Sequence, residues 1–263
     1  KWLDSTQILT ETAFGDFQIG KAKVAPSITW DGGASTSRWA DAFNWNPNGV
    51  PTGTSDVNLT GANTILIDTV AVCNSLTMNN GGLTLTVDST LTITGQLTLT
   101  SGVLNTLRNF PTAGSVSITG GTVGYTKTGL QTVSTQSYYN LNLGGSGAKT
   151  MPATVNVAGD FTVTGSATVT PNNGTINFNG SGAQSIAATT YYNLSLINTG
   201  VKTFAAGTTT ISNTFSVSGG ATPNATSFAT TIDYVGGSQT VVGMDYSTLQ
   251  ISGTGTKALG GTA

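Results

Sequence analysis

Residues 131–150 read QTVSTQSYYNLNLGGSGAKT, and residues 184–203 read QSIAATTYYNLSLINTGVKT. Residues 239–258, QTVVGMDYSTLQISGTGTKA, are a third copy of the same pattern. In every copy a Gln is followed by a Tyr, by a Leu shortly after that Tyr, and by a Lys near the end. The copies start at positions 131, 184 and 239, which is a nearly constant spacing of about 54 residues. Three anchors that keep register in this way indicate a repeat protein, whose units must stack to bury a common core.

Within each copy, apolar residues alternate with Thr, Ser and Asn, as in residues 141–143 (Leu-Asn-Leu) and 161–163 (Phe-Thr-Val). Such alternation is typical of a strand with one buried face, and Gly, Asn and Asp mark the turns between strands. The same pattern, without the anchors, begins near residue 58. We therefore predict an all-β fold, a right-handed parallel β-helix (β-solenoid) over residues 58–263. Tandem small β-sandwiches are the alternative, but a repeat of this length is short for a sandwich, which usually takes about 100 residues.

The length of the repeat predicts the number of coils. One third of a repeat is about 18 residues, a plausible length for one coil, so we predict three coils per repeat. At about 4.8 Å per coil, roughly eleven coils would give a rod about 50 Å long. Repeats start near residues 131, 184 and 239, and the last is truncated at Ala263. Together with a start at Lys1, this truncation predicts a piece of a longer protein.

The chain is almost free of charge. Charged residues make up 8% of it, against about 25% in ordinary globular domains, and the net charge is −2. The lack of a basic cluster argues against nucleic-acid binding, and no apolar run approaches the about 18 residues of a membrane span. The sequence has no His and a single Cys, so it lacks the usual general base and any Cys/His zinc cluster. We predict no cofactor and no metal, and we expect Cys73 to be an inert buried thiol.

The segment 28–57 has a character of its own. It contains, in order, Thr-Trp-Asp-Gly-Gly (29–33), Asn-Trp-Asn-Pro (44–47), Gly-Val-Pro (49–51) and Asp-Val (56–57). This order resembles a motif at the start of β-helical regions in very large secreted bacterial surface and adhesin-like proteins. The Gln, Tyr-Asn-Leu and Lys repeats resemble the arrays of those proteins as well. The resemblance covers about residues 28–263 and implies secretion and a surface location, with no assigned reaction.

Physical reasoning predicts a cap in the same place. The open end of a solenoid exposes strand edges and core, which large aromatic side chains cover with few residues. We therefore predict that residues 28–57 form a Trp-rich N-terminal cap. Residues 1–27 differ in composition from the repeat and are predicted to be an N-terminal extension, either packed as part of the cap or donated as a strand to a neighbouring subunit.

Aromatic residues are the candidates for contact with a glycan or a neighbouring subunit. Tryptophan faces stack well on sugar rings, and alternation turns one ring of each Tyr-Tyr pair inward and the other outward. The candidates are Trp30, Trp39, Trp45, Tyr138 and Tyr191.

One arrangement resembles a catalytic site. Asp68, Asp88 and Arg108 are evenly spaced by close to one coil length, so they would stack on adjacent coils. The simpler interpretation is that they are turn residues at coil corners, where Asp is common. We predict no catalytic residues.

Two further patterns belong to the surface. The anchor lysines Lys149, Lys202 and Lys257 follow Gly-rich turns, and we predict that they are solubilising charges at the edge of the rod. Thr-x-Thr pairs recur at residues 84–86, 92–94 and 98–100, and paired Thr hydroxyls on a flat solenoid are a feature of ice-binding surfaces. Thr is also simply a good outward-facing strand residue.

These observations favour an extracellular structural or adhesive repeat module of a bacterial surface protein. A nearly uncharged surface opposes self-association only weakly, so a self-assembling filament or lattice subunit belongs to this class, with neighbouring subunits or surface glycans as partners. A carbohydrate-binding or polysaccharide-degrading β-helix is the alternative, and ice binding is a minor one. We predict that the protein is not an enzyme.

Overall fold

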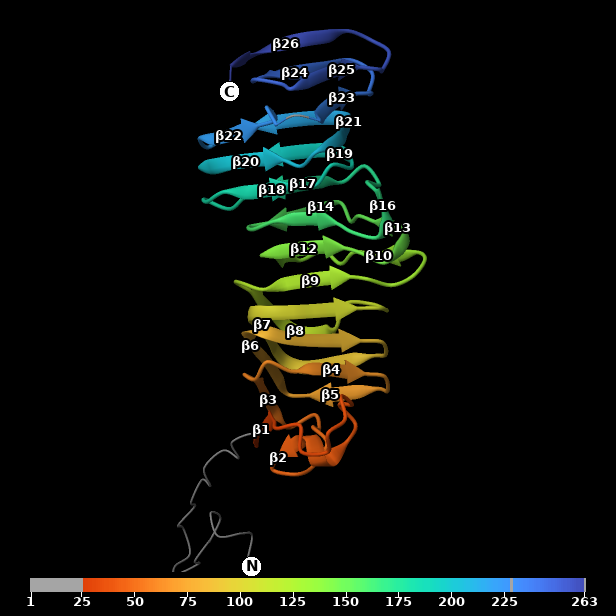
Figure 1. Ribbon diagram of the computed structural model, residues 1–263, viewed down its shortest axis with the longest axis vertical. Helices are drawn as coiled ribbons and strands as arrows, with labels where there is room; N and C mark the ends of the chain where they lie inside the picture. The colour runs from red at the N-terminus through yellow and green to blue at the C-terminus, as the bar shows by residue number, and fades with distance from the viewer. Residues whose placement is uncertain (1–25, 228, 263) are drawn as a thin grey trace, which may run out of the picture.

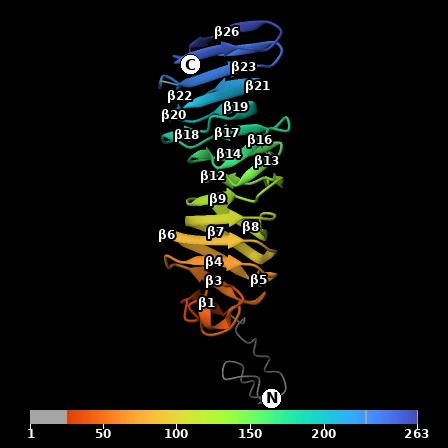
Figure 2. The same cartoon turned by 45° about the vertical axis from the view of Figure 1, so that its right-hand side comes forward.

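A computed structural model describes residues 26–227 and 229–262, which form a rod of stacked coils (Figure 1). The chain winds around the long axis in about ten turns, and a second view shows the same stack along its whole length (Figure 2). The ladders between coils are parallel, as in a β-solenoid. The predicted fold class is confirmed. Of the predicted extension 1–27, only Pro26 and Ser27 lie within the described residues.

The N-terminal end contains two short strands and a 3-10 helix, followed by the first coils. The end consists of β1 (Ser27–Trp30), the 3-10 helix Ala42–Asn44 and β2 (Trp45–Asn46). The coils before the repeats are built from β3 (Asp56–Leu59), β4 (Thr64–Ile67), β5 (Ala71–Cys73), β6 (Ser75–Val87), β7 (Leu91–Thr106), β8 (Thr112–Ile118) and β9 (Thr122–Tyr125).

The three repeats supply the remaining strands. The first repeat contains β10 (Gln131–Thr132), β11 (Ser137–Tyr138), β12 (Asn140–Leu143), β13 (Ser146–Thr150), β14 (Thr154–Val157), β15 (Phe161–Val163), β16 (Ser166–Thr170) and β17 (Thr175–Phe178). The second contains β18 (Gln184–Ile186), β19 (Thr190–Leu196), β20 (Gly200–Phe204), β21 (Gly207–Val217), β22 (Ala221–Asn224) and β23 (Thr230–Tyr234). The third contains β24 (Gln239–Gly243), β25 (Thr248–Ile251) and β26 (Lys257–Thr262).

The strands lie on three faces of the rod, and a coil takes one strand from each face. Face 1 carries β4, β9, β12 and β15, and β18, β20 and β22 continue it. Face 2 carries β10, β13 and β16, and the first half of β19, the first half of β21, β23 and β25 continue it. Face 3 carries β11, β14, β17 and the second halves of β19 and β21, followed by β24 and β26.

The prediction of three coils per repeat is wrong. The first repeat has eight strands, from β10 to β17, so it makes two and two-thirds coils. Leu141 pairs with Phe161 and Val155 pairs with Ile176, so one turn takes about 20 residues instead of the predicted length of about 18. Since eight is not a multiple of three, each repeat starts one face earlier than the one before, with β10 on face 2, β18 on face 1 and β24 on face 3.

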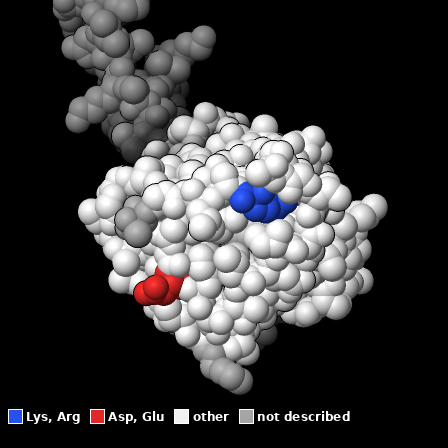
Figure 3. All heavy atoms as spheres, turned by 90° about the horizontal axis from the view of Figure 1, so that it is seen from above, with Lys and Arg blue, Asp and Glu red and all other residues white. Residues whose placement is uncertain are grey.

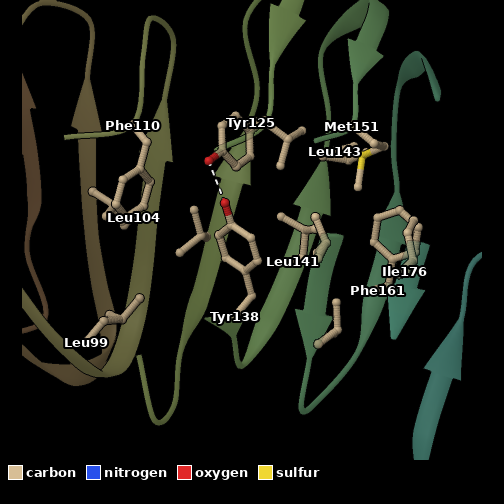
Figure 4. Close-up of a cluster of buried hydrophobic side chains, with 14 of the residues drawn as sticks. Leu99, Leu104, Phe110, Tyr125, Tyr138, Leu141, Leu143, Met151, Phe161 and Ile176 are labelled. Atoms are coloured by element: carbon tan, nitrogen blue, oxygen red, sulfur yellow. Dashed lines mark hydrogen bonds between the residues drawn. The ribbon is translucent and has the colours of Figure 1, made fainter. Parts of the chain in front are cut away.

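The alternating apolar residues fill the centre of the rod. In β12, Leu141 and Leu143 are fully buried while the Asn residues between and before them are partly exposed. Figure 4 shows this core around the first repeat, where the hydroxyl groups of Tyr125 and Tyr138 lie 2.7 Å apart. Because the inward apolar residues of one coil lie directly on those of the next, each apolar row forms a continuous column along the axis.

The ladders are interrupted at the start of each repeat. Within the described residues, β10 and β11 pair only with the coil above them, and β8 pairs only with the coil below it. In the same way, β18 has no ladder to β15, and β24 has none to β21. We call these places junctions 1, 2 and 3. Side chains, rather than backbone hydrogen bonds, must hold the coils together there.

The buried tyrosines predict a loss of stability at high pH. Burial raises the pKa of the Tyr191 phenol well above its usual value, so its contribution to stability is complete below about pH 10 and is lost above it, where the unfolded chain ionises first. We expect Tyr191→Phe to be less stable than the wild type by about 1 kcal/mol at pH 7, because the bond from its hydroxyl to the Ala187 carbonyl is lost. Above pH 10 this gap should close by about 1.4 kcal/mol per pH unit.

Urea unfolding of both proteins from pH 7 to 12 measures this gap. Burial lowers the pKa of Lys149 and Lys202, which therefore act in the opposite direction, but they are the same in both proteins and cancel in the difference. A gap that stays constant across the whole pH range would contradict the prediction.

Candidate functional site

The anchor glutamines bind each repeat to the coil below. The side-chain amide of Gln131 donates to the carbonyls of Thr106 and Arg108 at 2.8 and 2.9 Å. Gln184 makes the equivalent bonds to the carbonyls of Val157 and Gly159 at 2.9 and 2.6 Å. Gln239 repeats the contact with two carbonyls of β21. One buried side chain thus ties neighbouring coils at each junction where the backbone ladder is missing.

The anchor lysines bind the same junctions from the coil above. The Lys202 ammonium donates to the carbonyls of Gly180 and Gly182 at 2.6 and 3.1 Å and to Gln184 Oε1 at 2.6 Å. Lys149 likewise has three backbone carbonyls around its Nζ, between 2.6 and 3.2 Å. Three acceptors match the three N–H donors of an ammonium group.

The prediction that the anchor lysines are surface charges is therefore wrong for two of the three. Lys149 and Lys202 are 0% exposed, and only Lys257, at the last junction, is partly exposed. Most of the acceptor carbonyls come from the segment that precedes the anchor Gln in the coil below, namely Lys127 and Gly129 for Lys149 and Gly180 and Gly182 for Lys202. A sequence pattern shows that Lys recurs, but it does not show which acceptors surround it.

The anchor tyrosines close the corner within each junction. Tyr138 donates to the carbonyl of Ser134 at 2.7 Å, and Tyr191 donates to that of Ala187 at 2.9 Å. Both are 1% exposed, whereas Tyr139 is 40% exposed, so one ring of the pair points in and the other out, as alternation predicted. The candidates Tyr138 and Tyr191 are thus the inward rings. They do not offer a face to a ligand in this structure.

The three candidate tryptophans lie together at the N-terminal end. Trp45 packs edge-on against Trp30 and Trp39, with ring centroids 5.0 and 4.7 Å apart, and its Nε1 donates to the Trp39 carbonyl at 2.8 Å. Trp30, Trp39 and Trp45 are 9%, 1% and 0% exposed. Their faces are turned toward one another and the core, so they cover the end of the rod rather than present a platform to sugar rings.

The motif around these tryptophans has a local structural explanation. The buried amide of Asn44 donates to the carbonyls of Thr36 and Arg38 at 3.1 Å each, which fixes the loop that precedes the 3-10 helix. A Cβ on Gly33 would lie 2.6 Å from the Phe43 carbonyl oxygen, so only glycine fits there. The residues of the motif therefore hold the loop that carries the tryptophans.

The prediction that Asp68, Asp88 and Arg108 stack on neighbouring coils is confirmed. All three line one hollow of about 400 Å³ beside junction 1, together with Asn109 and Phe110. Arg108 Nε contacts Asp88 Oδ1 at 3.3 Å, and Arg38 contacts Asp68 Oδ2 at 3.0 Å. Both carboxylates thus form ion pairs with arginines, and Asp68 Oδ1 is buried without a hydrogen-bond partner in the described residues.

A second hollow of about 360 Å³ adjoins the first and shares Arg108 and Asn109 with it. Lys127, Leu130 and Thr132 also line it, and Leu130 is 74% exposed. Sequence analysis did not find this hollow. Its signal was Lys127, a cation four residues before the first anchor Gln131, with the apolar Leu130 between them.

The Thr-x-Thr pairs do not stack on one another. Thr84 and Thr86 lie below Val103 and Asn105 on the next coil, so the row of paired hydroxyls ends after one coil. This arrangement does not favour the ice-binding alternative, which requires a regular two-dimensional array.

Cys73 is buried, and burial, together with the charge of Asp56, raises its pKa to about 12, so it stays a thiol at neutral pH. Across residues 26–227 and 229–262, no three His, Cys, Asp or Glu side chains gather as a metal site would need. The same residues contain no helix with the length and hydrophobicity to cross a bilayer.

No protein-family model, no curated protein and no solved structure matches the chain significantly.

The lysine contacts predict which junction is most sensitive to substitution. Lys202→Met keeps the length of the side chain but removes a donor from three acceptors, of which Gln184 Oε1 keeps the Gly180 N–H. We expect the variant to lower the free energy of unfolding by about 2–4 kcal/mol. Lys257→Met, the matched control, removes three equivalent bonds from a partly exposed site where water can replace them, and should cost less than about 1 kcal/mol. Urea denaturation measures both changes. The interpretation fails if the two variants lose equal stability.

Proposed function

We propose that the protein is an extracellular structural or adhesive repeat module of a bacterial surface protein. The observation that carries this proposal is where the recurring residues lie. The Gln, Tyr and Lys anchors of the repeat are used inside the rod to join coils. The turn between Gln and Tyr, in contrast, differs from copy to copy. Repetition has thus kept the residues that build a rod of regular width, as expected of a spacer or scaffold.

The charge of the surface supports the same proposal. Seen along the axis from the C-terminal end, the visible face of the rod carries few charged side chains (Figure 3). A surface with so little charge opposes close approach between rods only weakly, so lateral or end-to-end assembly is part of the proposal. The resemblance of residues 28–57 and of the repeats to secreted surface proteins supports an extracellular location.

A polysaccharide-degrading β-helix is the second candidate, and the hollow lined by Asp68, Asp88 and Arg108 is the observation that favours it. Glycoside hydrolysis uses two carboxylates with separate acid and base roles. Both carboxylates here form ion pairs with arginines, so neither is free to act as the acid. The geometry therefore supports this candidate less well than the structural one.

Electron microscopy and an activity screen together test the proposal. We expect the purified chain to appear as straight rods roughly 50 Å long, alone or in ordered assemblies, and to release no sugar from uronate polymers. A variant with Lys149→Met and Lys202→Met, which removes the ammonium groups of junctions 1 and 2, should give bent or broken rods. Catalytic release of sugars that is lost in Asp88→Asn would overturn the structural proposal in favour of the second candidate.

A further inference from the structure

The cations of the chain gather beside junction 1. Six Lys and Arg residues and eight Asp residues lie within the described part of the chain. Four of the six cations lie beside the two adjoining hollows, against only two carboxylates. The cations are Arg38, Arg108, Lys127 and Lys149, and the carboxylates are Asp68 and Asp88. This edge of the rod is therefore positive in a protein whose net charge is negative.

The second hollow holds the excess positive charge. Its lining includes Arg108 and Lys127 but no carboxylate. Arg108 uses its Nε to contact Asp88, and its side chain is still 62% exposed. Among the residues that the structure describes, the two ion pairs involve Arg38 and Arg108. No carboxylate there lies within 4 Å of the Lys127 ammonium. Both cations thus have capacity for an anion from solution.

The backbone of Lys127 is fixed from both sides. Its N–H donates to Gln131 Oε1 at 3.2 Å, and its carbonyl accepts from the Lys149 ammonium at 2.6 Å. The Gln131 and Lys149 contacts that hold junction 1 together therefore also position the Lys127 backbone at the rim of the hollow. A backbone that is already fixed loses little conformational entropy on binding, which favours recognition of a ligand by the Lys127 side chain.

Electrostatics favour an anion in this place. The pKa of Lys149 is lowered by burial and, in addition, by the positive charge of Lys127. An anion between Lys127 and Arg108 would relieve this repulsion between like charges.

We propose that the hollow over Arg108 and Lys127 binds the carboxylate or sulfate groups of an acidic polysaccharide. Arg is suited to bidentate contact with such groups. Asn109, Thr132 and Thr150 line the same hollow and supply the amide and hydroxyl groups that pair with sugar hydroxyls. The exposed Leu130 beside them provides apolar surface for the face of a sugar ring. Because the first hollow continues the second across Arg108, the surface suits a chain of sugars rather than a single ion.

Junction 2 provides a comparison within the same molecule. It also has a hollow, of about 310 Å³, which overlaps the equivalent place in the repeat at Phe161, Thr162 and Ser185. When the two repeats are aligned on their anchor glutamines, Phe161 takes the place of Arg108, and Ala183 takes the place of Leu130. The hollow of junction 2 is lined by alanine, threonine and serine side chains, besides Phe161, Val163 and Ile186, with no charged group. The break in the ladder is common to both junctions, and of the two hollows the one at junction 1 is lined by cations.

The test compares binding of polygalacturonate with binding of neutral dextran by the whole chain. Arg108→Gln combined with Lys127→Gln should weaken binding of polygalacturonate by at least about tenfold, since two charge-assisted contacts are lost. The matched control is Ala183→Asp combined with Ala206→Asp, two exposed positions at junction 2. It lowers the net charge by the same two units, so a wild-type affinity in the control shows that the place, rather than the net charge, decides binding. Lys127→Gln alone, which breaks no side-chain hydrogen bond or ion pair in the described residues, separates binding from folding.

The outcomes are decisive in both directions. Binding of polygalacturonate that weakens with added salt, is absent with dextran and is lost only in the junction 1 variants supports the proposal. No binding by the wild type, equal losses in both double variants, or equal affinity for single-stranded DNA of matched charge overturns it. The inference rests on the proposed adhesive function only for its setting outside the cell. Its failure would leave the rod and its assembly, measured by microscopy, as a separate result.

Discussion

The rod depends on how it satisfies backbone groups where the ladders between coils stop. A parallel solenoid is stable because each coil pairs its N–H and C=O groups with the coils above and below. At the start of each repeat this pairing fails for the first strand, and unpaired buried groups are costly. Three side chains compensate: a Gln from within the junction, a Lys from the coil above and a Tyr that closes the corner. The period of the sequence repeat is therefore the distance along the chain between one set of these Gln, Lys and Tyr contacts and the next.

The sequence predicted the parts of the fold that depend on local pattern. Alternation of apolar and polar residues predicted the strands and the inward face of β12, and it predicted that one ring of each Tyr pair is buried. The even spacing of Asp68, Asp88 and Arg108 predicted that they would share a place, because any regular stack brings such residues together. These predictions needed only the period of a strand and the approximate length of a coil.

The sequence could not predict the features that depend on three-dimensional surroundings. Lys149 and Lys202 look like surface charges in the sequence, because nothing in it shows that three acceptors converge on each ammonium. The predicted number of coils per repeat was wrong, because dividing the repeat length by three assumes that each repeat makes a whole number of turns. Lys127 was missed because its significance comes from Arg108, which belongs to the preceding coil.

The offset between repeat and coil determines how the surface is displayed. Because a repeat makes two and two-thirds coils, the same position in successive repeats points in directions about 120° apart. The surface therefore follows a threefold screw, which returns to its starting direction after three repeats and eight coils, or roughly 38 Å. In an array of many repeats, a contact residue at one position would point in all three directions around the axis. A fibre built in this way would meet neighbours or ligands from every side, whereas a repeat of three whole coils would present a single stripe.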